Sequence, residues 1–208
     1  MDEQRVIENN KEEVPFRHYC ELFRDLDPAE AAVRCNVPYE NGEFRVRLLD
    51  TEYLIAWPEF AIRTESGDGL ALSKLPFQTF LMRWLLESKA AEVKEPTLTF
   101  REMPWGEVYI GPFTGRCLTR AAFTFGTRIT AFRKGAEALG GEIQNHGDAS
   151  YRFQLISGYT MELIVWEGDE EFPPASQILY SDTFTDGFSA EDRVVAGDIL
   201  ITAIRARM

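Results

Sequence analysis

The densest group of chemically active side chains in this 208-residue chain lies in the stretch WEGDEEFPPASQILYSD, residues 166–182. Its aromatic opening and its acids form one candidate functional loop: Trp166, Glu167, Asp169, Glu170, Glu171 and Asp182. Carboxylates grouped on a loop can bind hard cations such as Mg²⁺ or Ca²⁺, and carboxylates of different burial can do acid–base work. The alternatives are a turn that faces water and a turn that its own carboxylates fix through backbone N–H bonds.

An enzyme built on these acids needs basic partners, and the chain offers few. The candidate partners are Arg116, Arg120 and His146. For an enzyme, we expect these side chains to meet the acids in a concave pocket. For a binding protein, we expect exposed aromatic residues, with Trp105 and Tyr109 as candidates, and no convergent polar pocket.

Nucleophilic and metal chemistry have weaker support. Cys117 lies between Arg116 and Arg120, whose charges would lower the pKa of its thiol if they pointed at it, but an ordinary buried thiol is the favoured interpretation. The 2 histidines and 3 cysteines are scattered, and neither C-x-x-C nor H-E-x-x-H occurs. The motifs G-x-S-x-G and G-x-G-x-x-G are absent as well. We therefore assign no metal ligands, and the cofactor is unknown.

The composition argues against two classes of partner and indicates the cellular compartment. The formal net charge is -12, and a surface this acidic repels nucleic acid and anionic lipid. The acidic start MDEQRVIENNKEEV is unlike a signal peptide, and no apolar run approaches the roughly 20 residues that cross a bilayer. An odd number of scattered cysteines fits reduced thiols. We expect an acidic cytoplasmic protein that binds neither nucleic acid nor membrane.

Helical periods of apolar residues predict most of the helices. They cover five stretches: residues 14–26, 27–35, 75–88, 119–139 and 189–208. Asp27 is a predicted N-cap, and Ser189 is another with Asp192 three residues later. Gly126 is expected to divide the fourth stretch. The third stretch has the broadest apolar face and is the predicted central helix of the core.

Alternating and apolar runs predict strands that are mostly paired by hairpins. They cover residues 44–48 and 53–57, and two strands around Ser157-Gly158 within residues 151–166. The segment 98–113 is predicted to be extended, and residues 140–151 to be a turn. Because hairpins outnumber strand–helix–strand crossovers, we predict an α+β fold of mainly antiparallel strands packed with helices. Residues 1–14 would be a flexible leader and residues 15–208 a single compact domain, with two lobes meeting near residue 70 as the alternative.

Four stretches carry a resemblance to a known family: LDPAEAAVRCNVPYENGEFRVRLLDTEYLIAWP, FREMPWGEVYIGPFTGR, AEALGGE and WEGDEEFPPASQILYSD. They resemble the DUF3786 family of uncharacterised bacterial and archaeal proteins, from about residue 26 to the C-terminus. The resemblance implies a family common in anaerobes, some of whose relatives carry an iron–sulfur module that this chain lacks. It supplies no catalytic residues.

The resemblance and the sparse catalytic residues together favour one function class over another. We predict a binding or accessory module, linked to anaerobic redox or one-carbon metabolism, with a redox or metal-handling protein as its partner. The alternative is a carboxylate-dependent enzyme, using a hard metal or acid–base chemistry, built on the acidic loop. The oligomeric state is not predicted.

Overall fold

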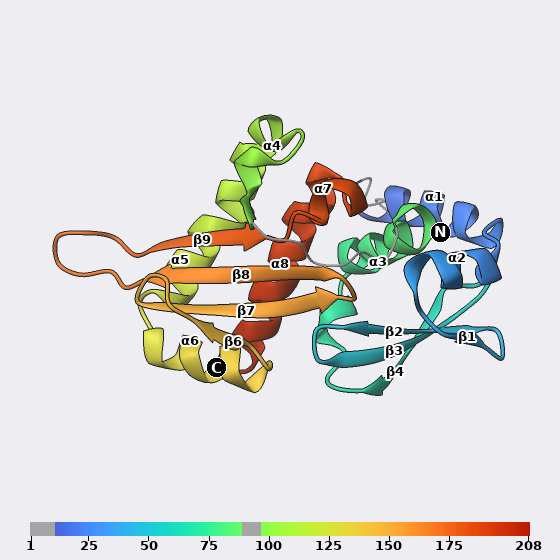
Figure 1. Ribbon diagram of the computed structural model, residues 1–208, viewed down its shortest axis with the longest axis horizontal. Coiled ribbons are helices and arrows are strands. Elements are labelled where there is room, and N and C mark those ends of the chain that lie inside the picture. Colours follow the sequence, from blue (N-terminus) through green and yellow to red (C-terminus); the bar gives the residue numbers. More distant parts are fainter. Residues whose placement is uncertain (1–10, 89–96) are drawn as a thin grey trace, which may run out of the picture.

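The computed structural model describes residues 11–88 and 97–208, and within these residues helices pack on two antiparallel sheets (Figure 1). The predicted α+β class with mainly antiparallel strands is confirmed. The predicted leader lies mostly outside the described residues, although Glu13 and Val14 already belong to the first helix. In the described part of the chain, no helix is long and apolar enough to cross a membrane.

The first half of the chain forms a four-stranded sheet and three α-helices. Its elements are α1 (Glu13–Arg24), α2 (Pro28–Cys35), β1 (Tyr39–Glu40), β2 (Glu43–Leu48), β3 (Thr51–Ala56), β4 (Ala61–Ser66), the 3₁₀ turn η1 (Leu70–Leu72) and α3 (Leu75–Glu87). Asp27 caps α2 as predicted, since its carboxylate accepts the N–H groups of Ala29 and Glu30. Strand β2 buries alternate side chains and leaves Arg45 and Arg47 exposed on its other face.

The middle of the chain is helical where an extended segment was predicted. Its elements are β5 (Leu98–Thr99), η2 (Phe100–Glu102), α4 (Gly106–Phe113), the π-helical stretch η3 (Thr114–Thr119), α5 (Arg120–Phe125) and α6 (Ile129–Ala138). The prediction for residues 98–113 is therefore wrong beyond β5. Phe100 and Phe113 stack at 4.1 Å between ring centroids, and this buried contact favours the helix. The helix passes Pro112 and continues as the π-helical stretch, a place where the regular hydrogen-bond ladder is disturbed.

The last third of the chain builds a five-stranded sheet with the order β5-β9-β8-β7-β6. Its further elements are β6 (Glu142–Gln144), β7 (Ala149–Ile156), β8 (Tyr159–Trp166), β9 (Ala175–Tyr180), α7 (Phe184–Gly187) and α8 (Ala190–Ala206). The hairpin at Ser157-Gly158 is confirmed, with Gly158 at a φ of 80°. The short strand β6 lies in residues that were predicted to be a turn. The prediction missed it because a strand of three residues, mostly polar and preceded by glycines, has no clear strand pattern.

Helix α8, more than α3, occupies the centre of the molecule. The predicted capping box of Ser189 and Asp192 is confirmed at its start. The helix crosses one face of the five-stranded sheet and contacts α3, α4, α6 and the π-helical stretch, so that residues on nearly all its sides are buried (Figure 1). One core of buried residues runs through both sheets. The N–H of Leu49, after β2, also donates to the carbonyl of Leu155 in β7 at 2.7 Å.

Candidate functional site

The acidic loop connects β8 to β9 and extends beyond the end of the sheet (Figure 1). The carboxylate of Asp169 accepts the N–H groups of Phe172 at 2.7 Å and Glu171 at 2.8 Å. These two hydrogen bonds, that of Phe172 first, hold the pKa of Asp169 below its usual range. The other acids of the loop face solvent: Glu167, Glu170 and Glu171. The contacts of Asp169 are those of a turn fixed by its own carboxylate.

The base of this loop is held by neighbouring backbone. The N–H of Glu167 donates to the carboxylate of Asp148 at 2.8 Å, and the N–H of Gly168 donates to the carbonyl of Gly126. Trp166 is 39% exposed beside this anchor. Asp182 lies after β9, where its carbonyl accepts the N–H and hydroxyl of Thr185 in the turn that starts α7.

The candidate partners Arg116, Arg120 and His146 form their ion pairs or hydrogen bonds with residues outside the candidate loop. Arg116 donates to Glu191 at 2.9 Å, and Arg120 forms an ion pair with Asp198; both acids lie in α8. His146 Nδ1 lies 2.7 Å from an oxygen of Glu162, which is only 2% exposed. Within the described residues, no hydrogen bond or ion pair joins these partners to the acids of the candidate loop. The constellation required by the carboxylate enzyme is therefore not assembled in this structure.

Cys117 is an ordinary buried thiol, as favoured from the sequence. Burial raises its pKa to about 12, and the charges of Arg116 and Arg120 offset this only in part. Its sulfur contacts the carbonyl of Val194 in α8. Among the residues that the structure describes, no three His, Cys, Asp or Glu side chains gather as a metal-binding cluster. Trp105 is 73% exposed, whereas Tyr109 is half-buried against the core.

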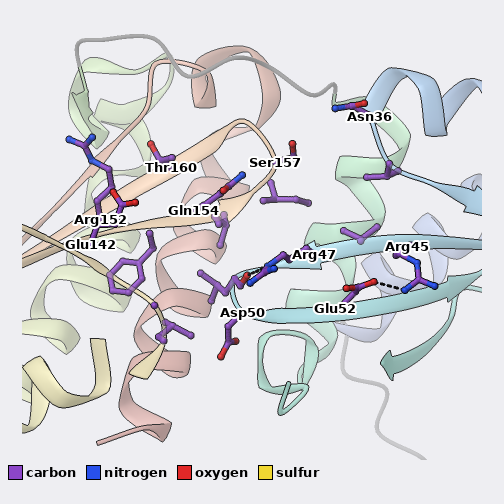
Figure 2. Close-up of a pocket in the computed structure, with 18 of the residues that line it drawn as sticks. Asn36, Arg45, Arg47, Asp50, Glu52, Glu142, Arg152, Gln154, Ser157 and Thr160 are labelled. Carbon is purple, nitrogen blue, oxygen red and sulfur yellow. Dashed lines mark hydrogen bonds and ion pairs between the residues drawn. The ribbon is translucent and has the colours of Figure 1, made fainter. Parts of the chain in front are cut away.

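A cavity of about 750 Å³ lies between the two sheets, beside the backbone bond from Leu49 to Leu155 (Figure 2). One wall comes from residues 36–38, β2 and β3. The other comes from β7, the start of β8 and the connection from α6 to β6. The polar lining includes Asn36, Arg47, Gln154, Ser157 and Thr160; apolar lining comes from Val37, Pro38, Leu139, Phe153 and Ile156.

Two of the carboxylates in this pocket form ion pairs. Asp50 lies 2.7 Å from Arg207, and Glu52 lies 2.5 Å from Arg45. The hydrogen bond from Arg45, supported by the charges of Arg45 and Arg47, lowers the pKa of Glu52. Figure 2 shows Glu52 reaching toward Arg45, while Arg47 extends from β2 in the other direction.

Arg47 has one hydrogen bond in the described part of the chain. Its Nε donates to the carbonyl of Leu49 at 3.2 Å. Glu52 faces Arg47 in the β2–β3 register, but the carboxylate of Glu52 is paired with Arg45. No carboxylate of the described residues lies within ion-pair distance of the Arg47 guanidinium. The pocket therefore holds a cationic fork whose two terminal nitrogens are available to a ligand.

Comparison with known proteins identifies a family. The family described as Domain of unknown function (DUF3786) matches residues 27–203. This chain belongs to the DUF3786 family. No curated protein and no solved structure matches it. The DUF3786 match starts at the N-cap of α2 and ends in α8, so both walls of the pocket lie inside the family's domain.

The sequence did not point to this site within the DUF3786 domain. The alternation in FRVRL marks Arg45 and Arg47 as outward-facing, which is the only local signal. Nothing local indicates that Gln154 would lie across a cavity from them, because β2 and β7 are about a hundred residues apart. The carboxyl-rich stretch drew attention instead because its charges are adjacent in sequence.

Proposed function

We propose that this DUF3786 protein is a non-catalytic binding protein whose ligand occupies the pocket between the two sheets. The observation that carries the proposal is the cavity itself, about 750 Å³ in volume and lined from both sheets. Small-molecule sites are concave, of about 300–1,000 Å³, with apolar walls and a few placed polar groups. Asn36, Gln154, Ser157 and Thr160 are polar groups of this kind.

The chemistry of the lining favours binding over catalysis. Its described residues include no histidine, cysteine or lysine. Asp50 and Glu52 are held in ion pairs, so neither carboxylate is placed to exchange a proton with a ligand. A convergent polar pocket was expected for an enzyme rather than a binding protein, but this pocket contains none of the acids or bases that the enzyme required.

The finer statements about function stay predictions. The link to anaerobic redox or one-carbon metabolism and the redox or metal-handling partner rest on the family resemblance alone. The carboxylate-dependent enzyme stays the alternative, and the exposed acids of the loop do not support it. Cytoplasmic location and the absence of nucleic-acid binding rest on composition.

A neutral apolar dye, N-phenyl-1-naphthylamine, tests the proposal, because its fluorescence rises when it enters apolar surroundings. We expect saturable binding by the wild-type protein. Gln154→Trp should abolish it by filling the pocket, since Gln154 is exposed in the lining. Gln177→Trp is the matched control: Gln177 lies on the same face of the same sheet, outside the lining. It should bind the dye normally.

The same experiment defines the results that would contradict the proposal. Absence of saturable binding by the wild-type protein would overturn the proposal, as would equal binding by both tryptophan variants. Melting temperatures close to that of the wild-type protein would show that both variants fold.

A further inference from the structure

The ion pairs of the pocket show which of its arginines already have partners. Asp50 shares Arg207 with Asp68, each at 2.7 Å, and Glu52 shares Arg45 with Glu65. Arg207 and Arg45 are thus each held between two carboxylates and are not available to an anionic ligand.

The third carboxylate of the lining also faces a cation. Glu142 lies directly opposite Arg152 in the register of β6 and β7, and Glu162 lies opposite Arg152 in the register of β7 and β8. Opposite charges across neighbouring strands attract each other. Arg152 is thus placed between two acids of its own sheet, so its charge already faces carboxylates of the protein.

Arg47 is the exception among the pocket's charges. Its guanidinium carries five N–H donors, and among the described residues only Nε has an acceptor, the carbonyl of Leu49. The side chain is exposed and projects from β2 toward β7 (Figure 2). The free edge of a guanidinium matches the two oxygens of a carboxylate or phosphate, and such bidentate pairs are among the strongest polar contacts.

The setting makes this cation more selective than a surface arginine. The whole chain carries a net charge of -12, so anions are repelled from most of its surface. A cation inside a concave site acts at close range and is less screened than one in open solvent. Elsewhere on the same wall of the pocket, Val37 is half-buried and Pro38 is exposed, and both offer apolar surface.

We propose that the pocket binds a small organic oxyanion, with its carboxylate or phosphate group on Arg47 and its apolar body against Val37 and Pro38. This inference rests on the proposed function, since it names the ligand class of the same pocket. Gln154, Ser157 and Thr160, on the opposite wall, would accept or donate hydrogen bonds to polar substituents on the body.

Competition against N-phenyl-1-naphthylamine tests the ligand class with three matched naphthalenes. Naphthalene-1-carboxylate and 1-naphthyl phosphate carry the oxyanion, and naphthalene-1-carboxamide is the neutral control. We expect at least one anion to displace the dye about tenfold more strongly than the carboxamide, as a charge-assisted pair warrants. The stronger anion distinguishes a carboxylate site from a phosphate site, and either result supports the oxyanion class.

Variants at position 47 locate the effect. In Arg47→Gln, the anions should displace the dye no more strongly than the carboxamide does. Arg47→Lys keeps the charge without the fork, so it should retain part of the preference for anions. Arg63→Gln is the matched control, since Arg63 lies in β4 of the same sheet, pairs with Glu43 and does not line the pocket. It should keep the full preference.

The outcomes separate the two proposals. If the dye binds and the three naphthalenes compete equally, or if Arg47→Gln keeps the anion preference, the oxyanion inference is overturned while the binding function stands. If the dye does not bind the wild-type protein, the binding function itself fails. Because Arg47 is exposed and makes one hydrogen bond, its variants should fold normally.

Discussion

Two guanidiniums show how differently this fold uses the same side chain. Arg193, in α8, is 2% exposed and donates to three carbonyls: Pro104 at 2.7 Å, Phe188 at 3.1 Å and Phe184 at 3.3 Å. It ties α7 and the segment before α4 to the central helix.

Arg47 is exposed, lines a cavity and donates to one carbonyl. The difference lies in where the acceptors come from. The fold supplies acceptors for a buried cation that stabilises it, because burial without them is costly. A cation that lines a cavity and has an acceptor for only one of its nitrogens among the described residues is available to a ligand instead. Whether the fold supplies partners for a charged side chain therefore distinguishes structural residues from ligand-binding residues. It does so better than the number of charges nearby in the sequence.

Removing each arginine should have very different consequences for stability. Arg193→Met should lower the free energy of unfolding by about 3 kcal/mol, because it leaves buried carbonyls without their donors. Arg47→Met should change it by no more than about 0.5 kcal/mol, as is usual for an exposed site with few contacts. Urea unfolding followed by circular dichroism measures both. Equal losses for the two variants would show that Arg47 is also part of the architecture, and the contrast would fail.

A second prediction asks whether ion pairing elsewhere keeps Arg47 available. Arg207→Gln leaves Asp50 without its partner at the edge of the pocket, where the Asp50 carboxylate can attract Arg47. The preference for anionic naphthalenes should then fall about twofold to fivefold, the range expected for a partly exposed ion pair. Dye competition measures it. Arg205→Gln, an exposed neighbour on α8, should leave the preference unchanged. If both variants behave alike, Asp50 does not compete for Arg47.

How far the sequence predicts this molecule depends on how local each signal is. The caps at Asp27 and Ser189 were predicted because their hydrogen bonds join residues two or three apart. The hairpin at Gly158 was predicted for the same reason. Residues 98–113 were misassigned because Pro104 and Pro112, each beside a glycine or tryptophan, indicate turns locally, whereas packing of the Phe113 ring favours the helix.

The pocket could not be predicted from either of its walls. Arg47 reads as one of two outward-facing arginines in a short strand, and Arg45 looks identical in the sequence. Only the folded structure shows that Arg45 is paired with Glu52 and Glu65 while Arg47 has no such partner among the described residues. The Asp169 loop illustrates the converse, since its adjacent acids are conspicuous in sequence and its one bonded carboxylate closes a turn.

The smallest expected effect tests whether Asp169 belongs with the architectural groups. Backbone N–H bonds lower its pKa in the folded state, so its stabilising contribution is present above the unfolded pKa of about 3.9. That contribution is lost as the pH falls through the lowered folded value. The difference in urea midpoint between wild type and Asp169→Ala should therefore be constant near neutrality and shrink below about pH 4.

Glu170→Ala is the control for this pH dependence, because Glu170 is an exposed acid of the same loop. Its difference from the wild-type protein should stay flat across the same pH range. If the difference in urea midpoint for Asp169→Ala is also independent of pH, the turn does not use the charge of Asp169. The ionised carboxylate would then be available for the cation that the loop's sequence suggested. Asp169 would no longer count as a structural group in contrast to Arg47.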